Sequence, residues 1–503
     1  MQRIQADRPH PLHSLAATRA HEQAWLQALP AHALMQRAGL AVARLALALA
    51  PHARTFWVAC GSGNNGGDGL EAAACLRAWG ARPIVTWLGS PERASADTRA
   101  SWQRAVAAGV LFGDEVPDLG PDDLAIDALL GIGLQARESL PDGDPRLQEW
   151  VARLNGGPAP VLAVDLPSGL RCDQGGSALN DSQGRPLLVQ ARHTLSLLTL
   201  KAGLFTAQGR DAAGQVWLAP LDLPPPQAPA LAWLGGPPTP GSRPHASHKG
   251  SFGDVAVLGG EGLSRRGMGM SGAALLAAQA ALHAGAGRVL WAPLERPALS
   301  WAPEQPELML RSPEALDLPQ LTVVCGCGAG QSLGPWLMHC LQQAPRLVLD
   351  ADALNALALD APAQAALRQR PARGQVLTPH PLEAARLLSV LHPGTRAADV
   401  QADRLAAAQA LARHFQAVVA LKGSGTVVAS PEHTPVINPT GNARLASAGT
   451  GDVLAGWIAA RLASGLTAFD AACAAVFEHG RRADEWPPEH PLTALSLARS
   501  AHP

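Results

Sequence analysis

The stretch Thr55-Phe-Trp-Val-Ala-Cys-Gly-Ser-Gly-Asn-Asn-Gly-Gly-Asp-Gly69 decides the fold of the first half of the chain. Its apolar start, Thr55–Cys60, predicts a buried β-strand, and the glycines that follow predict a tight turn. Residues 68–79 then have the pattern of a helix, with Asp68 at its start. A strand, a glycine turn and a helix in this order predict backbone amides that face a phosphate group.

Short apolar runs separated by amphipathic stretches recur along the whole chain. Further strands are expected at Arg82–Leu88, Leu124–Leu129, Val161–Val164, Val255–Leu258, Thr322–Cys325, Leu347–Leu349, Val376–Leu377 and Val418–Leu421. This alternation predicts an α/β fold, with two doubly wound domains whose parallel sheets carry helices on both faces. In such sheets ligands bind at the carboxyl ends of the strands, which is where the polar motifs described below lie.

A segment rich in proline and glycine divides the chain. Leu223–Pro244 reads LPPPQAPALAWLGGPPTPGSRP, a composition that predicts a linker without a helix or a central strand. The expected domains are therefore residues 1–222 and 245–503, joined by residues 223–244.

The composition excludes several classes of protein. Of 503 residues, 47% are hydrophobic and 16% are charged, with a net charge of −1, so we expect neither a nucleic-acid-binding nor a membrane-surface protein. No apolar run is long enough to span a bilayer and Met1–Pro11 lacks a signal core, so a cytoplasmic location is expected. The seven cysteines form no CxxC pair, which favours free thiols.

Three strand ends in the first half carry polar side chains. The GxGxxG match at Gly61 is weak alone, and no Gly-Lys-Ser/Thr follows as in a Walker loop. Asn65, Asp127 and Ser168 offer only oxygen ligands of the kind that suits an alkali or alkaline-earth cation. The alternatives are a plain tight turn for the asparagines and helix caps or turns for the aspartates.

Four motifs of this half together resemble the NAD(P)H-hydrate epimerase domain of the YjeF N-terminal type. They are GNNGGDG, DALLGIG, VDLPSGL and Leu34-Met-Gln-Arg-Ala-Gly39, and Lys201 lies in a further similar segment. The resemblance implies K⁺ bound by Asn65, Asp127 and Ser168, and inversion at C6 of the hydrated nicotinamide ring. It implies that the hydrated nucleotide contacts Asn64, Asn65, Gly66, Gly67, Asp68, Gly131, Ile132, Gly133, Leu134, Gln135, Ala136, Arg137 and Asp165. We assign Asp165 as an acid/base for this step.

The strongest motif of the second half is Asn442-Ala-Arg-Leu-Ala-Ser-Ala-Gly-Thr-Gly-Asp452, followed by a helix pattern at Val453–Leu462. Successive amides after Gly449 form an anion hole at the helix start, where the helix dipole also favours negative charge. Asp452 would then stand beside a phosphate in transfer and take a proton from an attacking hydroxyl. The alternative is an N-cap aspartate after a glycine turn.

Other motifs of this half also follow predicted strands. Asp350 and Asp352 are placed for a Mg²⁺–nucleotide, Lys422 for a nucleotide phosphate, and His380 for the same strand-end edge. Only three lysines remain in an arginine-rich chain, namely Lys201, Lys249 and Lys422, so these positions favour a compact ammonium. The Cys325-Gly-Cys-Gly-Ala-Gly330 segment predicts a flexible loop.

In this order, the motifs resemble the ADP/ATP-dependent NAD(P)H-hydrate dehydratase domain, which has a ribokinase-like fold. The resemblance implies that Asp452 is the catalytic base and that the hydrated nucleotide contacts Ala273, Gly328, Gly330, His380 and Asp452. It implies that the adenine nucleotide contacts Lys422, Gly423, Ser424, Gly425, Thr426 and Gly451. Leu445, Ala448 and Ala329 depart from the family pattern, and Ala448 keeps the turn if its φ is negative.

These observations predict a bifunctional enzyme of metabolite repair. It would epimerise the R and S hydrates of NADH and NADPH and dehydrate the S form at the expense of ADP or ATP, with K⁺ in the first domain and Mg²⁺ in the second. A homo-oligomer is expected. One alternative is a ribokinase-like small-molecule kinase fused to a nucleotide-binding module, and another is a first domain that only binds. Loss of Asn65 and Asp127 would favour the latter, and both are present.

Overall fold

The computed structural model describes residues 1–133, 145–181, 183–239, 244–264, 267–295, 305–370 and 374–501. The chain forms two compact units, one of Met1–Gln5 with Pro11–Ala232 and one of Ala6–His10 with Trp233–Pro503. Within the described ranges, no helix has the length and apolarity that a membrane crossing requires. The seven cysteines are free thiols, as expected from their spacing.

The first unit is built on a sheet in the strand order β1-β10-β8-β7-β6-β3-β4-β5. Every neighbouring pair is parallel except β1 with β10. The strands are β1 (Gln2–Arg3), β3 (Phe56–Cys60), β4 (Pro83–Trp87), β5 (Leu111–Phe112), β6 (Leu124–Ala128), β7 (Val161–Val164), β8 (His193–Leu197) and β10 (Gln215–Ala219). Beginning at β5, the chain order 3-2-1-4-5-6 is that of a Rossmann-type sheet, which confirms the predicted fold class.

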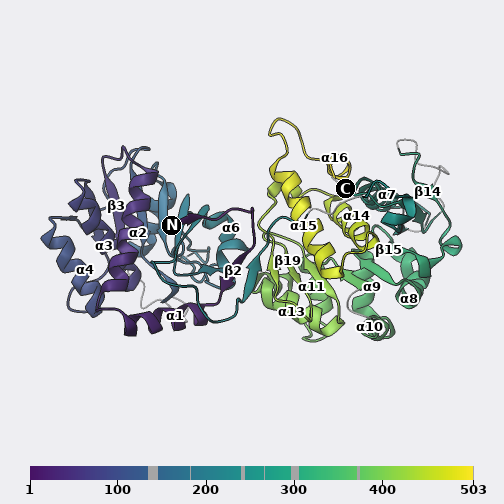
Figure 1. Ribbon diagram of the computed structural model, residues 1–503, viewed down its shortest axis with the longest axis horizontal. Helices are drawn as coiled ribbons and strands as arrows, with labels where there is room; N and C mark the ends of the chain where they lie inside the picture. Colours follow the sequence, from purple (N-terminus) through teal and green to yellow (C-terminus); the bar gives the residue numbers. More distant parts are fainter. Residues whose placement is uncertain are drawn as a thin grey trace. The chain divides into compact units, whose positions relative to one another are not determined.

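Helices cover both faces of this sheet (Figure 1). They are α1 (Leu15–Ala28), α2 (Ala33–Leu49), α3 (Asn64–Ala78), α4 (Ala96–Ala107), α5 (Pro145–Gly156) and α6 (Gly209–Ala212). Val58 of β3 faces the core formed with α2 and α3, whereas Trp57 faces the core formed with α5, as the alternation of a strand requires. A short pair, β2 (His10–His13) with β9 (Leu200–Lys201), brings Lys201 into a fixed register.

The start predicted for the helix that follows β3 was wrong. Helix α3 begins at Asn64, with Gly63 as its N-cap, so Asp68 lies in the second turn. Glycine is a poor helix former, but here close packing outweighs propensity. A Cβ on Gly66 would lie 2.0 Å from the carbonyl oxygen of Gly61, and one on Gly69 would lie 2.6 Å from Cβ of Ala128. Only glycine allows the helix to begin so close to the sheet.

The second unit has the strand order β14-β13-β12-β15-β16-β17-β18-β19-β20-β11. The pairs from β14 to β18 are parallel, and β19 is antiparallel to both its neighbours. The strands are β11 (Ala232–Leu234), β12 (Asp254–Gly259), β13 (Arg288–Pro293), β14 (Met309–Leu310), β15 (Thr322–Cys325), β16 (Arg346–Leu349), β17 (Gln375–Leu377), β18 (Val418–Leu421), β19 (Val427–Ala429) and β20 (Val436–Ile437). The chain reverses its direction across the sheet between β12 and β15, which marks the place where α/β sheets bind ligands.

Two layers of helices enclose this second sheet (Figure 1). One layer holds α7 (Ser271–His283), α14 (Thr450–Ala463), α15 (Ala468–Asp484) and α16 (Ala494–Arg499). The other holds α8 (Gly334–Gln343), α9 (Asp352–Leu359), α10 (Ala361–Arg368), α11 (Pro381–Leu388), α12 (Ala397–Ala402) and α13 (Arg404–Phe415). The doubly wound architecture predicted for this half is therefore confirmed.

The segment predicted to be a linker without a helix or a central strand contains the short strand β11. Strand β11 pairs in parallel with β20, joining Trp233 to Val436 and Leu234 to Ile437. The apolar Ala-Leu-Ala-Trp-Leu sequence lies between the prolines, and Leu234 is buried. Prolines flank the strand instead of interrupting its hydrogen bonds, so the proline content of the whole segment was misleading.

Candidate functional site

The first unit contains a cavity of about 1170 Å³ at the carboxyl ends of β3, β6 and β7. Seven of the residues predicted to bind the hydrated nucleotide line it: Asn64, Asn65, Asp68, Gly131, Ile132, Gly133 and Asp165. Gly66 and Gly67 lie beneath this lining, where they pack against neighbouring chain segments. Leu134, Gln135, Ala136 and Arg137 fall outside the described residues.

The first turn of α3 borders this cavity. Its leading amides have no partner within the helix and carry the positive end of the helix dipole, so they favour a phosphate. Asn65 is buried in that turn, and among the residues that the structure describes its side-chain nitrogen has no hydrogen-bond partner. A buried amide group without a partner is costly unless a ligand completes it.

Asp127 and Ser168 form a compact buried pair below the cavity. Ser168 donates to Asp127 twice, from Oγ to Oδ1 at 2.6 Å and from its backbone N–H to Oδ2 at 2.8 Å. Burial raises the pKa of Asp127 to about 6, and these neutral donors compensate only partly. A monovalent cation would balance the carboxylate, so the donor chemistry of Asn65, Asp127 and Ser168 fits K⁺.

Asp165 and Lys201 form a second buried pair, at the wall of the cavity. Lys201 is fully buried and donates to Asp165, to the Leu197 carbonyl at 2.7 Å and to Ser196 Oγ at 3.2 Å. These three acceptors use all three protons of the ammonium group. Asp165 adopts a left-handed φ of 66°, and its Oδ1 also accepts from the backbone N–H of Leu197 at 3.0 Å. Lys201 therefore holds Asp165 and has no proton left for a ligand.

Two of the other carboxyl groups that line the same cavity as Asp165 have raised pKa values. Asp68 lies on α3 and Glu22 on α1, and both line the cavity. Burial raises the pKa of Asp68 well above its ordinary value, and the nearby Asp165 and Glu22 carboxylates add to this. Burial and Asp165 also raise the pKa of Glu22. A carboxyl group with a raised pKa beside a lysine-paired carboxylate is the arrangement that separates acid and base roles. Glu22 has no motif signal and was missed by the sequence analysis.

In the second unit, the predicted anion hole lies at the start of α14. Gly449 is the N-cap with a φ of 89°, and Asp452 lies in the first turn. Ala448 does not have a positive φ, so the turn tolerates alanine where the family pattern has glycine. Burial raises the pKa of Asp452 to about 6, and the Asp350 carboxylate contributes to the increase. Asp452 is therefore poised to change protonation state near neutral pH.

Charged residues from two strand ends and from α11 meet beside this helix. Lys422 Nζ lies 2.7 Å from Asp350 Oδ1 and 3.9 Å from Glu383 Oε2. Burial alone would lower the pKa of Lys422, but the Asp350 and Glu383 carboxylates outweigh burial and raise it. Lys422 Nζ also lies 3.3 Å from where a Cβ of Gly451 would be, so the ammonium reaches the α14 turn. Lys422, Gly451 and Asp350 are thus brought together, as predicted.

His380 lies at the start of α11 and has a structural role. Its Nδ1 accepts from the backbone N–H of Leu382 at 3.1 Å, and Glu383 in return accepts from the His380 N–H at 2.8 Å. Burial and Lys422 lower the pKa of His380, which favours a neutral ring. The ring is nevertheless close to half exposed. Nε2 lies 3.3 Å from Oε1 of the buried Glu383, so any contact with a ligand is made by the exposed part of the ring.

The loop after β15 supplies the opposite wall. Gly326, Gly328 and Gly330 have φ values of 117°, 57° and 54°, which only glycine adopts easily. A Cβ on Gly328 would lie 2.9 Å from Cβ of Ala273, and one on Gly330 would lie 2.1 Å from Oε2 of Glu261. Ala273 and both glycines therefore meet at the crevice between β12 and β15. The buried Glu261 was not found from the sequence.

The loop after β18 contains the remaining predicted nucleotide contacts. Gly423 has a φ of 136° and lies against the guanidinium of Arg404, which donates to the carbonyls of Leu421 at 3.1 Å and Lys422 at 3.2 Å. Arg404 is fully buried, so it fixes the loop from below. The predicted members Ser424, Gly425 and Thr426 follow on this loop, and Gly425 has a φ of 65°.

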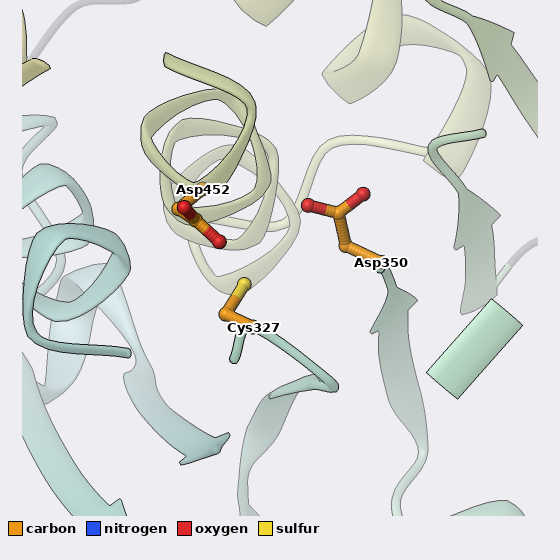
Figure 2. A group of neighbouring side chains, drawn as sticks. All are labelled: Cys327, Asp350 and Asp452. Carbon is orange, nitrogen blue, oxygen red and sulfur yellow. The ribbon is translucent and has the colours of Figure 1, made fainter. Parts of the chain in front are cut away.

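Sequence reasoning missed one neighbour of Asp452. Cys327 Sγ, Asp350 and Asp452 place one ligand atom each within 4.8 Å of one another (Figure 2). Cys327 is fully buried, and burial together with the Asp452 and Asp350 carboxylates raises its pKa well above the ordinary value. The sequence showed only a glycine-rich loop here, because the other two residues are distant along the chain.

Comparison with known proteins finds a matching family for each half of the chain. A family model described as YjeF-related protein N-terminus matches residues 31–203, and one described as NAD(P)H-hydrate dehydratase matches residues 257–502. The bifunctional NAD(P)H-hydrate repair enzyme Nnr of Escherichia coli (strain K12) is 35% identical over 496 residues, covering 92% of this chain and 87% of that protein.

The chain belongs to the bifunctional NAD(P)H-hydrate repair enzymes. A further relative of this repair enzyme matches its second half alone. The ADP-dependent (S)-NAD(P)H-hydrate dehydratase of Neisseria meningitidis is 44% identical over 251 residues, covering 48% of this chain and 80% of that protein. A solved ADP/ATP-dependent NAD(P)H-hydrate dehydratase from Bacillus subtilis, co-crystallised with ATP and Mg²⁺, is 32% identical with a TM-score of 0.43, covering 51% of this chain and 90% of that one.

Proposed function

We propose that this chain repairs hydrated NADH and NADPH through two reactions, one in each half. The first half interconverts the R and S hydrates, and the second half dehydrates the S form at the expense of ADP or ATP. The observation that supports this most is that an acid-lined cavity and a helix-start anion hole occur in one chain of a bifunctional repair family. We propose domains at residues 1–222 and 245–503, with 223–244 between them and β11 inside that segment.

For dehydration, Asp452 is the base. Its carboxylate takes the proton of the C6 hydroxyl while that oxygen attacks the terminal phosphoryl group of the nucleotide. The amides after Gly449 and the ammonium of Lys422 stabilise the negative charge in transfer. The ring nitrogen then expels phosphate from C6, and loss of a proton from C5 restores the double bond of NAD(P)H. Mg²⁺ supplies charge compensation for the nucleotide phosphates, and Asp350 and Asp352 are the carboxylates placed to hold it.

For epimerisation, two carboxyl groups with different environments divide the work. Asp165 removes the proton of the C6 hydroxyl, and the bond from C6 to the ring nitrogen breaks. Asp68, protonated because its pKa is raised, gives its proton to that nitrogen. Rotation of the resulting aldehyde, followed by closure with the protons returned, inverts C6. Lys201 keeps Asp165 in place.

K⁺ has a structural and electrostatic part in the first half. Asn65, Asp127 and Ser168 would hold it, since Asp127 is buried with only neutral hydrogen-bond donors. The cation would fix the loops that follow β3, β6 and β7 around the nucleotide. The homo-oligomeric state expected from the sequence stays a prediction, which size-exclusion chromatography with light scattering checks.

The direct test of this function is incubation of the purified chain with mixed S and R hydrates and ADP, then ATP, followed by chromatography. The proposal expects NADH from the S hydrate with a nucleotide present and none without it. If no NADH forms from either hydrate while the nucleotide is consumed with added small alcohols, a small-molecule kinase replaces this proposal.

A further inference from the structure

The second unit holds a group of potential metal ligands that includes sulfur. Cys327 lies in the loop after β15, Asp350 directly after β16, and Asp452 in the first turn of α14. Strands β15 and β16 are paired in parallel, so their ends lie side by side. Figure 2 shows the sulfur and both carboxylates directed into one shared space.

We propose that Cys327, Asp350 and Asp452 form a binding site for a thiophilic divalent cation, Zn²⁺ by its chemistry, and that Zn²⁺ bound there blocks the dehydration reaction. The binding half of this inference stands on the geometry alone. The inhibitory half rests on the proposed function, because it needs Asp452 to act as the base.

The geometry suits a small cation with minor adjustment. The three ligand atoms lie within 4.8 Å of one another, whereas ligands of a tetrahedral Zn²⁺ lie about 3.3 to 3.7 Å apart, given bonds of about 2.0 to 2.3 Å. Rotation of the two aspartate side chains would close this difference. Cys327 is fully buried, so the surrounding atoms restrict the sulfur.

The ligand set selects the metal. Mg²⁺ requires oxygen ligands and keeps its waters, so a buried thiol is of no use to it. Zn²⁺ binds thiolate and carboxylate together, and it deprotonates a coordinating thiol that would otherwise stay neutral. Three protein ligands leave a fourth position for water.

The charges agree with a divalent cation. With the thiol ionised, the three ligands carry three negative charges, and the Glu383 carboxylate lies 3.9 Å from Lys422 Nζ, whereas Lys422 supplies a single positive charge. This excess of negative charge favours a divalent cation. Lys422 and Thr378 both donate to Oδ1 of Asp350. Oδ2 lies 4.0 Å from the position that a Cβ on Gly451 would occupy. Asp350 therefore has an oxygen on the side of the α14 turn for the cation.

The consequence for the enzyme follows from the identity of the ligands. A carboxylate bound to Zn²⁺ cannot take a proton from the substrate, so dehydration stops. Because Asp350 is also placed for the Mg²⁺–nucleotide, Zn²⁺ and the nucleotide compete. The simpler interpretation is that Cys327 only donates a hydrogen bond to Asp452. Serine keeps such a donor and loses the soft ligand, so Cys327→Ser separates the two interpretations.

The experiment titrates Co²⁺, a spectroscopic substitute for Zn²⁺, into the metal-free full chain without nucleotide. We expect one Co²⁺ per chain, an ultraviolet thiolate-to-cobalt charge-transfer band, and loss of the band when Zn²⁺ is added. Cys327→Ser and Cys327→Ala should lose the band, and Asp452→Asn should weaken binding at least about tenfold. Cys473→Ser, on α15 away from the site, is the matched control and should keep the band.

Circular dichroism and thermal unfolding establish that each variant is folded before it is compared. A band that is absent in the unmodified chain, or that survives in a folded Cys327→Ser, overturns the binding site. In the rate assay, each protein is compared with its own zinc-free rate. Cys327→Ser should need at least about tenfold more Zn²⁺ for half-inhibition than the unmodified chain. Equal inhibition of both proteins overturns the inhibitory half. Absence of any dehydration would refute the proposed function and leave the binding result standing.

Discussion

Lys201 and Asp165 form an ion pair that is buried at the wall of the first unit's cavity, with Lys201 fully enclosed. All three ammonium protons are used within the protein, by Asp165, Leu197 and Ser196. Lysine at this position therefore acts by holding a carboxylate and not by touching a ligand. This accounts for a lysine in a chain that uses arginine almost everywhere else.

Replacing Lys201 by Met should destabilise the first unit by about 3 to 5 kcal/mol, because it leaves a buried charge without a partner. The double variant Asp165→Asn/Lys201→Met should recover part of the lost stability, since asparagine also tolerates a left-handed φ. Urea unfolding measures both. If Lys201→Met alone lowers the free energy of unfolding by less than about 1 kcal/mol, the pair is not buried in solution.

Potassium should stabilise the first unit in a pH-dependent manner. Burial raises the pKa of Asp127 to about 6 in the folded chain, against about 3.9 in the unfolded chain. The folded state thus binds more protons between these values, so its stability falls as pH rises from about 4 to about 6. K⁺ favours the ionised form, so the gain in Tm from KCl over choline chloride should be present at pH 8 and small at pH 5.

Asp127→Asn is the control for potassium, because it removes the charge and keeps the shape. It should abolish the difference between the two salts at both pH values. An equal potassium effect in Asp127→Asn would place the cation elsewhere.

Dehydration should depend on the ionisation of Asp452. Because its pKa is raised to about 6, kcat/KM should fall about tenfold per pH unit below that value and level off above it. The measurement is the rate of NADH formation from the S hydrate between pH 5 and pH 8. A rate that is flat across this range would remove Asp452 from the role of base.

The turn before α14 should tolerate a substitution of Ala448 and not one of Gly449. In Gly449→Ala, the new Cβ lies 2.7 Å from Leu276 Cδ1 at a φ of 89°, so the amides of the anion hole must move. We expect dehydration to fall at least about tenfold, with epimerisation unchanged. Ala448 is exposed and has no positive φ, so the dehydration rate of Ala448→Gly should stay within about threefold of that of the unmodified chain. Equal effects of the two changes would contradict the assigned turn.

Much of the sheet was predictable because its buried strands are short apolar runs, several of them followed directly by glycine or a charged residue. Val161–Val164, Thr322–Cys325 and Val418–Leu421 match the observed strands at both ends. The start of α3 and the strand β11 were not predictable, because close packing and strand pairing outweighed local propensity there. Sequence reasoning works where local pattern and tertiary packing agree.

The sites were predictable where a motif follows a strand. The parallel sheets bring Asp127 to Ser168, and Lys422 to Asp350, as their strand ends indicated. Glu22, Glu261 and Cys327 were missed because their approach depends on packing between distant segments. No spacing rule in one sequence reports such contacts.

The central claim is that one chain carries both reactions, and the conversion of pure R hydrate with ADP tests it most directly. The unmodified chain should form NADH from R hydrate faster than the spontaneous interconversion of the hydrates allows. Asp452→Asn should convert R to S without forming NADH, whereas Asp317→Asn, an exposed control, should behave as the unmodified chain. If NADH forms from R only at the spontaneous rate, or if Asp452→Asn forms it normally, the two-site account is contradicted.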